Sequence, residues 1–252
     1  MLRTVTSTCM QNIVRSFPTS LSIIEYPRAI TIPHLQTIST PFSHNFGTLT
    51  HITTDNQQQI IPTMVDISSK STTLRYAIGQ GKLYIPLIPS RIPINIKTIF
   101  TTSDLSTLSS TLLMERTTLF STAITAGTLG TKYTSNLIPM CHPLPIQKCH
   151  ITITSKEISC TSSLIPSHIK ELSSSLNFTS VIELLIQCKV TTLSNTGIEM
   201  EALTGTSITL LTLYDMLKNN IPHSLLHIHA IEIIEKLGGK SGHYIKDKSI
   251  LS

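Results

Sequence analysis

The sequence predicts an α+β domain in which helices cover one face of a mainly antiparallel sheet. Three segments rich in β-branched residues are typical of strands: HITIT (150–154), VIELLIQCKV (181–190) and HIHAIEII (227–234). Two further segments, 117–135 and 197–220, carry apolar residues at helical spacing. Strands and helices do not alternate regularly along the chain, and this argues against a parallel sheet with helices on both faces.

The clearest predicted helix is GIEMEALTGTSITLLTLYDMLKNN, residues 197–220. Asn195-Thr196-Gly197 supplies its cap region, and Asn219-Asn220 followed by Pro222 supplies its stop. The apolar residues of this segment cover a broad face, which predicts that six side chains are buried: Met200, Leu203, Leu210, Leu213, Tyr214 and Leu217.

Polar residues are also spaced in an informative way along this helix. Asp215 and Lys218 stand three residues apart and are neighbours on the helix surface, where such a pair is most often an ordinary ion pair. Glu201 lies on nearly the same side as Asp215. At a rise of about 1.5 Å per residue, however, the two residues are about 21 Å apart along the helix axis.

The other segments complete a plan of one domain from about Met64 onwards. Residues 117–135 suit a helix despite their threonines, because apolar residues fall at positions 120, 123, 124 and 129. Residues 26–62 contain four prolines without a sustained period and are typical of a linker. The stretch 85–97 breaks at its prolines, and the Ser-rich stretch 156–178 is interpreted as an inserted surface loop.

The composition narrows the class of protein. The 252 residues are 40% hydrophobic but only 5% aromatic, so the core must be aliphatic. The net charge of +5 is spread along the chain, which disfavours a nucleic-acid-binding module and leaves anionic small molecules as ligands. No run approaches the roughly 18–20 apolar residues of a membrane span. Five scattered cysteines indicate a reducing compartment.

The first residues have the composition of an organelle transit peptide. Arg3 and Arg15 occur among several Ser and Thr residues, and no acidic residue precedes Glu25. We therefore expect residues 1–62 to be a transit peptide and linker, and residues 63–252 to be the folded domain. The expected destination is the mitochondrial matrix, with the plastid as the weaker alternative and a tail without function as the third interpretation.

Two motifs suggest chemistry that their spacing does not favour. CHPLPIQKCH (141–150) holds two Cys-His pairs, but zinc ligands are usually two to four residues apart, and adjacent residues point to opposite sides of an extended chain. The same geometry disfavours Cys141 as a nucleophile with His142 as its base. LGGKSG (237–242) lacks the first glycine of a phosphate-binding loop, since Ile234 stands at that position.

Five stretches in order resemble the MoaC family, the cyclic pyranopterin monophosphate synthases of molybdenum cofactor biosynthesis. They are MVDISSK (64–70) with Arg75, TSNLIPMCHPL (134–144), GIEMEALT (197–204), LYDMLK (213–218) and EKLGGKSG (235–242). The resemblance implies a ferredoxin-like two-layer fold and a homo-oligomer, a hexamer built from dimers with shared active sites. It also implies a lyase that converts a cyclised dihydroguanosine triphosphate to cyclic pyranopterin monophosphate and pyrophosphate, with no metal and no cofactor.

The resemblance also assigns roles to individual residues. Asp215, Lys218, His142 and Arg116 would be catalytic, with Asp215 as the acid–base residue. The substrate-binding residues would be Met140, Cys141, His142, Met200, Glu201, Lys70, Arg75, Lys236 and Lys240. The prolines around Cys141 and His142 rule out regular structure, so a rigid loop would project both side chains into a pocket.

Some positions depart from the family pattern. Arg116 stands where the family carries a catalytic lysine, Asn136 replaces an acidic residue, and His243 follows the final GGKSG. The segments around 85–110 and 156–178 are longer than the family norm. The alternative function is therefore a non-catalytic relative that binds or assembles with the upstream radical enzyme.

Overall fold

The computed structural model describes residues 50–55, 57, 59–239 and 242–246. Its main sheet has five antiparallel strands in the order β4-β5-β3-β6-β7. The strand bounds are β3 Thr73–Pro86, β4 Lys148–Ser159, β5 Ser180–Ser194, β6 His227–Leu237 and β7 Tyr244–Ile245. The helices are α1 Ile94–Thr101, α2 Ser110–Lys132, α3 Thr134–Leu137, α4 Ser167–Leu176 and α5 Glu199–Leu217, with short 3₁₀ turns at Leu105–Thr107 and His223–Leu225.

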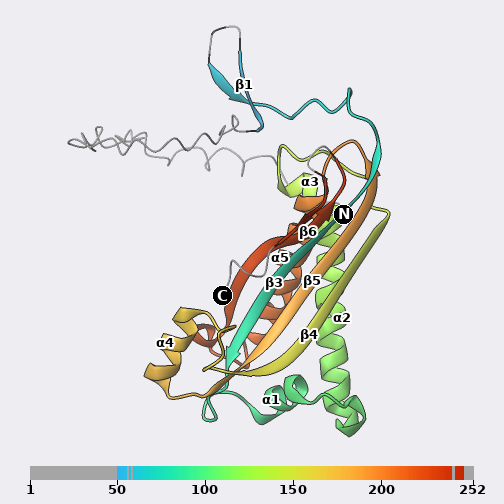
Figure 1. The fold of residues 1–252 in the computed structure, drawn as a ribbon. Coiled ribbons are helices and arrows are strands. Elements are labelled where there is room, and N and C mark those ends of the chain that lie inside the picture. Colours follow the sequence, from blue (N-terminus) through green and yellow to red (C-terminus); the bar gives the residue numbers. More distant parts are fainter. Residues whose placement is uncertain (1–49, 56, 58, 240–241, 247–252) are drawn as a thin grey trace, which may run out of the picture. The chain divides into compact units, whose positions relative to one another are not determined.

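The chain order β3-α2-β4-β5-α5-β6 is the βαββαβ arrangement of ferredoxin-like folds. The two long helices α2 and α5 lie side by side against one face of the sheet (Figure 1). The predicted α+β class, the antiparallel sheet and the placement of helices on one face are confirmed. The predicted strands at 150–154, 181–190 and 227–234 correspond to β4, β5 and β6.

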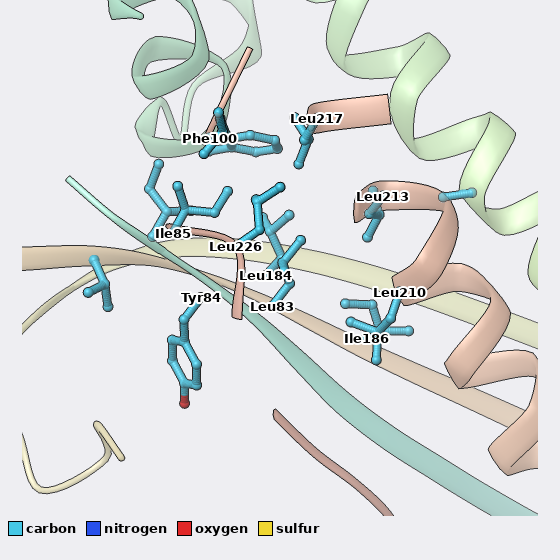
Figure 2. Packing of buried hydrophobic residues seen from close by; sticks show 14 of the residues in the cluster. Leu83, Tyr84, Ile85, Phe100, Leu184, Ile186, Leu210, Leu213, Leu217 and Leu226 are labelled. Carbon is cyan, nitrogen blue, oxygen red and sulfur yellow. The ribbon is translucent and has the colours of Figure 1, made fainter. Parts of the chain in front are cut away.

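The core lies between the sheet and the helices, and every second residue of β3 points into it. Leu83 and Ile85 point toward the helices and are fully buried, while Tyr84 between them points the other way (Figure 2). On the helix side they meet the fully buried Leu210 and Leu213 of α5. Each such aliphatic side chain contributes about 1.5–3 kcal/mol by leaving water.

Small residues let the two long helices approach closely. A Cβ atom added to Gly127 of α2 would lie 2.0 Å from Thr209 Oγ1 and 2.8 Å from the carbonyl oxygen of Gly205, both in α5. This contact fixes α5 against α2 and the sheet, and therefore fixes where the first turn of α5 points.

The sequence prediction misses the central strand. β3 pairs with β5 from Thr73↔Ser194 to Pro86↔Val181 and also pairs with β6. Gly79, Gly81 and Lys82 interrupt its apolar pattern. Glycine is required at position 79 because an added Cβ would lie 2.5 Å from the carbonyl oxygen of Ala202 in α5.

The interpretation of residues 156–178 as a surface loop is wrong. β4 continues to Ser159, α4 spans Ser167–Leu176, and Ile165, Ile169 and Phe178 are buried. Serine is compatible with a helix, and the two buried isoleucines, four residues apart, hold α4 against the rest of the domain. The stretch 85–97 is irregular only between the end of β3 and the start of α1.

Smaller differences occur at other boundaries. The helix predicted at 117–135 begins earlier, at Ser110, where Ser109 accepts a hydrogen bond from the amide of Leu112. Met200 is 40% exposed although burial was predicted, and the first turn of α5 has no side-chain cap. A hairpin of β1 (Ile52–Thr54) and β2 (Ile60–Pro62) lies within the predicted linker.

Residues 1–49, which carry the predicted transit peptide, lie outside the described residues. Within the described part of the chain, no helix is long and apolar enough to cross a membrane.

Candidate active site

A cavity of about 140 Å³ opens at the first turn of α5, beside the loop that follows α3. Three of the predicted site residues, Met140, Cys141 and His142, line it from the loop, and Met200 with Glu201 line it from the helix. The structure thus brings together residues that are about sixty positions apart in the sequence. The remaining lining residues are His51, Leu144, Thr196, Gly197 and Glu199.

The loop that carries Cys141 and His142 is held at both ends. The amide of Cys141 donates to the carbonyl oxygen of Ile138 at 3.0 Å and closes a turn after α3. The hydroxyl of Thr192, which is buried in β5, donates to the carbonyl oxygen of Pro145 at 2.8 Å. Prolines fix the backbone between these points, so the loop presents its side chains to the cavity with little loss of entropy on binding.

Glu201 is the buried acid of this cavity. Only 4% of its surface is exposed. Burial, together with the negative charge of Glu199, raises its pKa from 4.5 to about 7. Burial and the nearby Glu201 also raise the pKa of the Cys141 thiol. Near neutral pH the cavity therefore holds a carboxyl group that can both give and take a proton, next to an un-ionised thiol.

Glu199 is a site residue that the sequence analysis does not single out. Its Oε1 atom lies 2.8 Å from Nζ of Lys236 on β6, so an acid that lines the cavity forms an ion pair with a lysine of the sheet. A Cβ atom at position 197 would lie 1.9 Å from Oε2 of Glu199, so the carboxylate of Glu199 lies directly against the backbone of Gly197. The sequence feature that could have identified Glu199 was the pair of acidic residues, two positions apart, at the start of α5 within GIEMEALT.

Arg75 connects the end of the sheet to the start of α5. Its Nε atom donates to the carbonyl oxygen of Ser194 at 3.0 Å, and Nη2 donates to that of Asn195 at 3.3 Å. Gly239, at φ +77°, lies so close that an added Cβ would be 2.5 Å from Nη1 of Arg75. Of the predicted basic residues, Arg75 and Lys236 thus lie at this end of the sheet. Lys240 lies outside the described residues.

Asp66 is a second residue that the sequence analysis does not single out. The amide of Ser68 donates to its Oδ1 atom at 2.8 Å. Hydrogen bonds from the backbone and the side chain of Ser68 lower the pKa of Asp66, and electrostatic interactions with His142 and Lys70 lower it further. Asp66 therefore lies within electrostatic range of His142 in the loop and of the predicted Lys70. The sequence feature that could have identified Asp66 was the acidic residue inside the motif MVDISSK.

Three of the four predicted catalytic residues lie elsewhere in this single chain. Asp215 and Lys218 are exposed near the end of α5, with Nζ and Oδ1 2.5 Å apart. A larger, mainly apolar cavity of about 470 Å³ lies beside them, between α1, α2 and the end of α5. The length of α5 therefore separates the Cys-His loop from the Asp-Lys pair.

Arg116 donates from Nη1 to the carbonyl oxygens of Ile99 and Thr102, both at 3.0 Å, and from Nη2 to Ser155 Oγ at 3.4 Å.

The two Cys-His pairs do not come together at one site. Among the residues that the structure describes, no group of three or more His, Cys, Asp and Glu side chains is arranged to hold a metal ion. Cys141 and His142 line the cavity at α5, whereas His150 lies on β4 and lines a different cavity with Lys148 and Lys189.

Comparison with known proteins gives one family. The family model described as the MoaC family matches residues 64–239. The chain is 33% identical over 204 residues to a protein named cyclic pyranopterin monophosphate synthase from Nostoc sp., covering 81% of this chain and 95% of that protein. It is 36% identical over 198 residues to a protein of the same name from Campylobacter lari, covering 79% and 98% respectively.

A longer relative also matches the chain. Over 196 residues, or 76% of this chain, it is 36% identical to a protein named molybdenum cofactor biosynthesis protein 1 from Dictyostelium discoideum. The matched region spans 26% of that longer protein.

Proposed function

The chain belongs to the MoaC family, and on that premise we propose that it is a cyclic pyranopterin monophosphate synthase, a lyase of molybdenum cofactor biosynthesis. Its substrate is (8S)-3',8-cyclo-7,8-dihydroguanosine 5'-triphosphate, and its products are cyclic pyranopterin monophosphate and pyrophosphate. The observation that carries this proposal is the cavity at α5, where the Cys141-His142 loop meets the buried Glu201 inside the matched region.

Proton transfer during ring opening and reclosure falls to groups that titrate near neutral pH. Glu201, with a pKa of about 7, supports a general acid–base role in the cavity. In this proposal Met140, Cys141, His142 and Met200 contact the part of the substrate that becomes the pterin.

The phosphates of the substrate require positive charge. Lys70, Arg75, Lys236 and Lys240 supply it, because ammonium and guanidinium groups bind phosphate through charge-assisted hydrogen bonds. Lys236 would exchange part of its contact with Glu199 for the phosphate.

The active site is shared between subunits in this proposal. A cavity of about 140 Å³ is smaller than the roughly 300–1,000 Å³ of pockets that enclose a small-molecule ligand. The predicted acid–base pair, Asp215 and Lys218, lies at the other end of α5 and is exposed. We propose that a neighbouring subunit of a hexamer built from dimers supplies this pair, with Arg116 as an additional cationic contact.

The direct test is release of pyrophosphate from the cyclised triphosphate by the purified full-length protein. We expect release, and we expect His142→Ala to reduce it strongly. His150→Ala is the matched control, because His150 is exposed on β4 and does not line the cavity at α5. A folded protein that binds the substrate but releases no pyrophosphate would favour the non-catalytic binding or assembly partner instead.

We also propose that the protein acts in the mitochondrial matrix, on the basis of the composition of its first residues. A reporter fused to residues 1–40 is expected to enter mitochondria. A reporter that stays in the cytosol would refute this localisation, and one that enters plastids would support the alternative.

A further inference from the structure

Two cysteines outside the proposed active site lie in contact beneath the helices. Cys149 of β4 and Cys188 of β5 have their Sγ atoms 3.9 Å apart. β4 and β5 are paired with Cys149 opposite Val190 and Ile151 opposite Cys188, so the two cysteines are diagonal neighbours on one face. That face is the one covered by α2 and α5, because Cys149 and Cys188 both approach Thr131 of α2.

The hydroxyl of Thr131 connects this pair to the start of α5. It lies 3.7 Å from Cys149 Sγ and 3.8 Å from Cys188 Sγ. It also lies 3.4 Å from the main-chain carbonyl oxygen of Glu201. A Cβ atom at Gly205 of α5 would be 2.7 Å from Cys188 Sγ, so the helix rests directly on this sulfur. A change in the position of either sulfur must therefore displace Thr131 and α5.

The two thiols differ in access and in acidity. Cys188 has no exposed surface, whereas Cys149 is only partly buried, so a dissolved oxidant reaches Cys149 first. Hydrogen bonding from Cys188, with further help from the hydroxyls of Thr131 and Thr128, lowers the pKa of Cys149. A lowered pKa increases the fraction of Cys149 that is thiolate, and the thiolate is the form that reacts with peroxides.

We propose that Cys149 and Cys188 are a peroxide-sensitive pair that forms a reversible disulfide. The Cys149 thiolate attacks one oxygen of hydrogen peroxide and displaces hydroxide, which leaves a sulfenic acid on Cys149. The sulfur of Cys188 attacks the sulfur of that sulfenic acid, and water leaves with the Cys188 proton. In sum, two thiols and one peroxide give one disulfide and two waters.

The disulfide is reversible because two equivalents of a small thiol reduce it by exchange. Its formation shortens the distance between the sulfurs from 3.9 Å to about 2.0 Å. This movement breaks the hydrogen bonds between the two thiols and Thr131. We therefore expect the backbone amides in the first turns of α5 to become less protected from hydrogen exchange.

Peptide mapping of the full-length protein tests the proposal. After brief treatment with hydrogen peroxide and alkylation of the remaining thiols, trypsin cleaves after Lys148, Lys156, Lys170 and Lys189. We expect peptides 149–156 and 171–189 to appear as one linked species, lighter than their sum by two hydrogen atoms. Dithiothreitol should separate them, and hydrogen exchange at 199–206 should be faster in the oxidised protein.

Three variants make the result specific. Cys149→Ser and Cys188→Ser each remove the linked species. Cys160→Ser is the matched control and retains it, because Cys160 is a buried cysteine without a thiol partner among the contacts described for it. Recovery of both cysteines in alkylated form would overturn the proposal. So would a link to Cys9 or Cys141, or oxidation of Cys149 beyond sulfenic acid without a link to Cys188.

Discussion

At the scale of the residue, Glu201 couples the proposed chemistry to stability. Its carboxyl group keeps its proton in the folded protein up to a pH of about 7, whereas the unfolded chain loses it near 4.5. The folded state therefore binds more protons in this window, and its stability falls as the pH rises from 4.5 to about 7. We expect Glu201→Gln, which cannot ionise, to gain up to about 3 kcal/mol of unfolding free energy relative to the wild type across this window.

Chemical denaturation of both proteins below and above the window measures this gain. Glu171→Gln is the control, because Glu171 is exposed on α4 and its replacement should give a difference that does not vary with pH. A constant difference for Glu201→Gln as well would show that burial does not hold its proton.

Arg116 should affect stability as well as catalysis. Its guanidinium joins the end of α1 to α2 through the carbonyl oxygens of Ile99 and Thr102. We expect Arg116→Ala to lose about 1.5–3 kcal/mol of unfolding free energy, the usual value for hydrogen bonds to a charged group. Arg116→Lys should lose much of the same amount, because one ammonium group does not reproduce the planar fork.

Kinetics of the same two variants separate the structural role of Arg116 from its proposed contact with phosphate. If the charge matters, kcat/KM falls about ten- to a hundred-fold in the folded alanine variant and stays near the wild-type value in the lysine variant. Unchanged kcat/KM in folded Arg116→Ala would leave Arg116 with its structural role alone.

At the scale of the element, α4 rests on the sheet through a cluster of imidazoles. The ring of His168 lies 6.0 Å from that of His227 and 5.7 Å from that of His229, both on β6. Burial and the charge of His168 lower the pKa of His227, and the same two causes together with Lys82 lower that of His229. Glu183, Glu232, Lys156 and Tyr84 are further charged or titratable groups near this cluster.

The lowered pKa values predict that acid loosens α4. As the pH falls below about 6.5, the unfolded state takes up protons before His227 and His229 do so in the folded state, so this contact loses stability. We expect hydrogen exchange in 167–176 to accelerate relative to α2 of the same sample when the pH is lowered through this range.

His168→Asn removes the central ring and should weaken the acid response. His150→Asn, on the same face of the sheet but with no ring contact described to this cluster, should leave it unchanged. An equal acid response in wild type and His168→Asn would assign the loosening of α4 to other groups.

The same elements show what the sequence could and could not predict. α2 and α5 were predicted because their apolar residues recur at helical spacing, and three strands were predicted because they are rich in β-branched residues. β3 was missed because Gly79 and Gly81 interrupt its apolar pattern. Glycine is needed at both positions because α5, with its Leu210 side chain, packs closely against them, and this packing is a property of the tertiary structure. Cys141, His142 and Glu201 were identified from family motifs. Glu199 was missed, because its partner Lys236 is 37 residues away and becomes visible only when β6 lies beside α5.

At the scale of the whole molecule, the shared active site can be tested by mixing two inactive variants. His142→Ala damages the part of the site at the start of α5, and Asp215→Ala damages the part at its end. If each site takes one part from each of two subunits, mixed oligomers contain some sites with both parts intact. We therefore expect activity to recover when the two variants are unfolded and refolded together.

The control is a mixture of His142→Ala with Glu201→Ala, since both residues line the same cavity and belong to the same subunit in this proposal. That mixture should recover no activity by this route. Absence of recovery in verified mixed oligomers of the first pair would count against a shared site.

The order of strands in the sheet also determines when the domain can form during synthesis. β3 is the first of the five strands to leave the ribosome, yet it lies at the centre and pairs with β5 and β6, which are made much later. Until then its backbone donors and acceptors have no partners in the sheet, and closing such distant pairs makes folding slow. The nascent polypeptide thus remains open to chaperones, or to threading through a narrow pore, until nearly the whole domain has been translated.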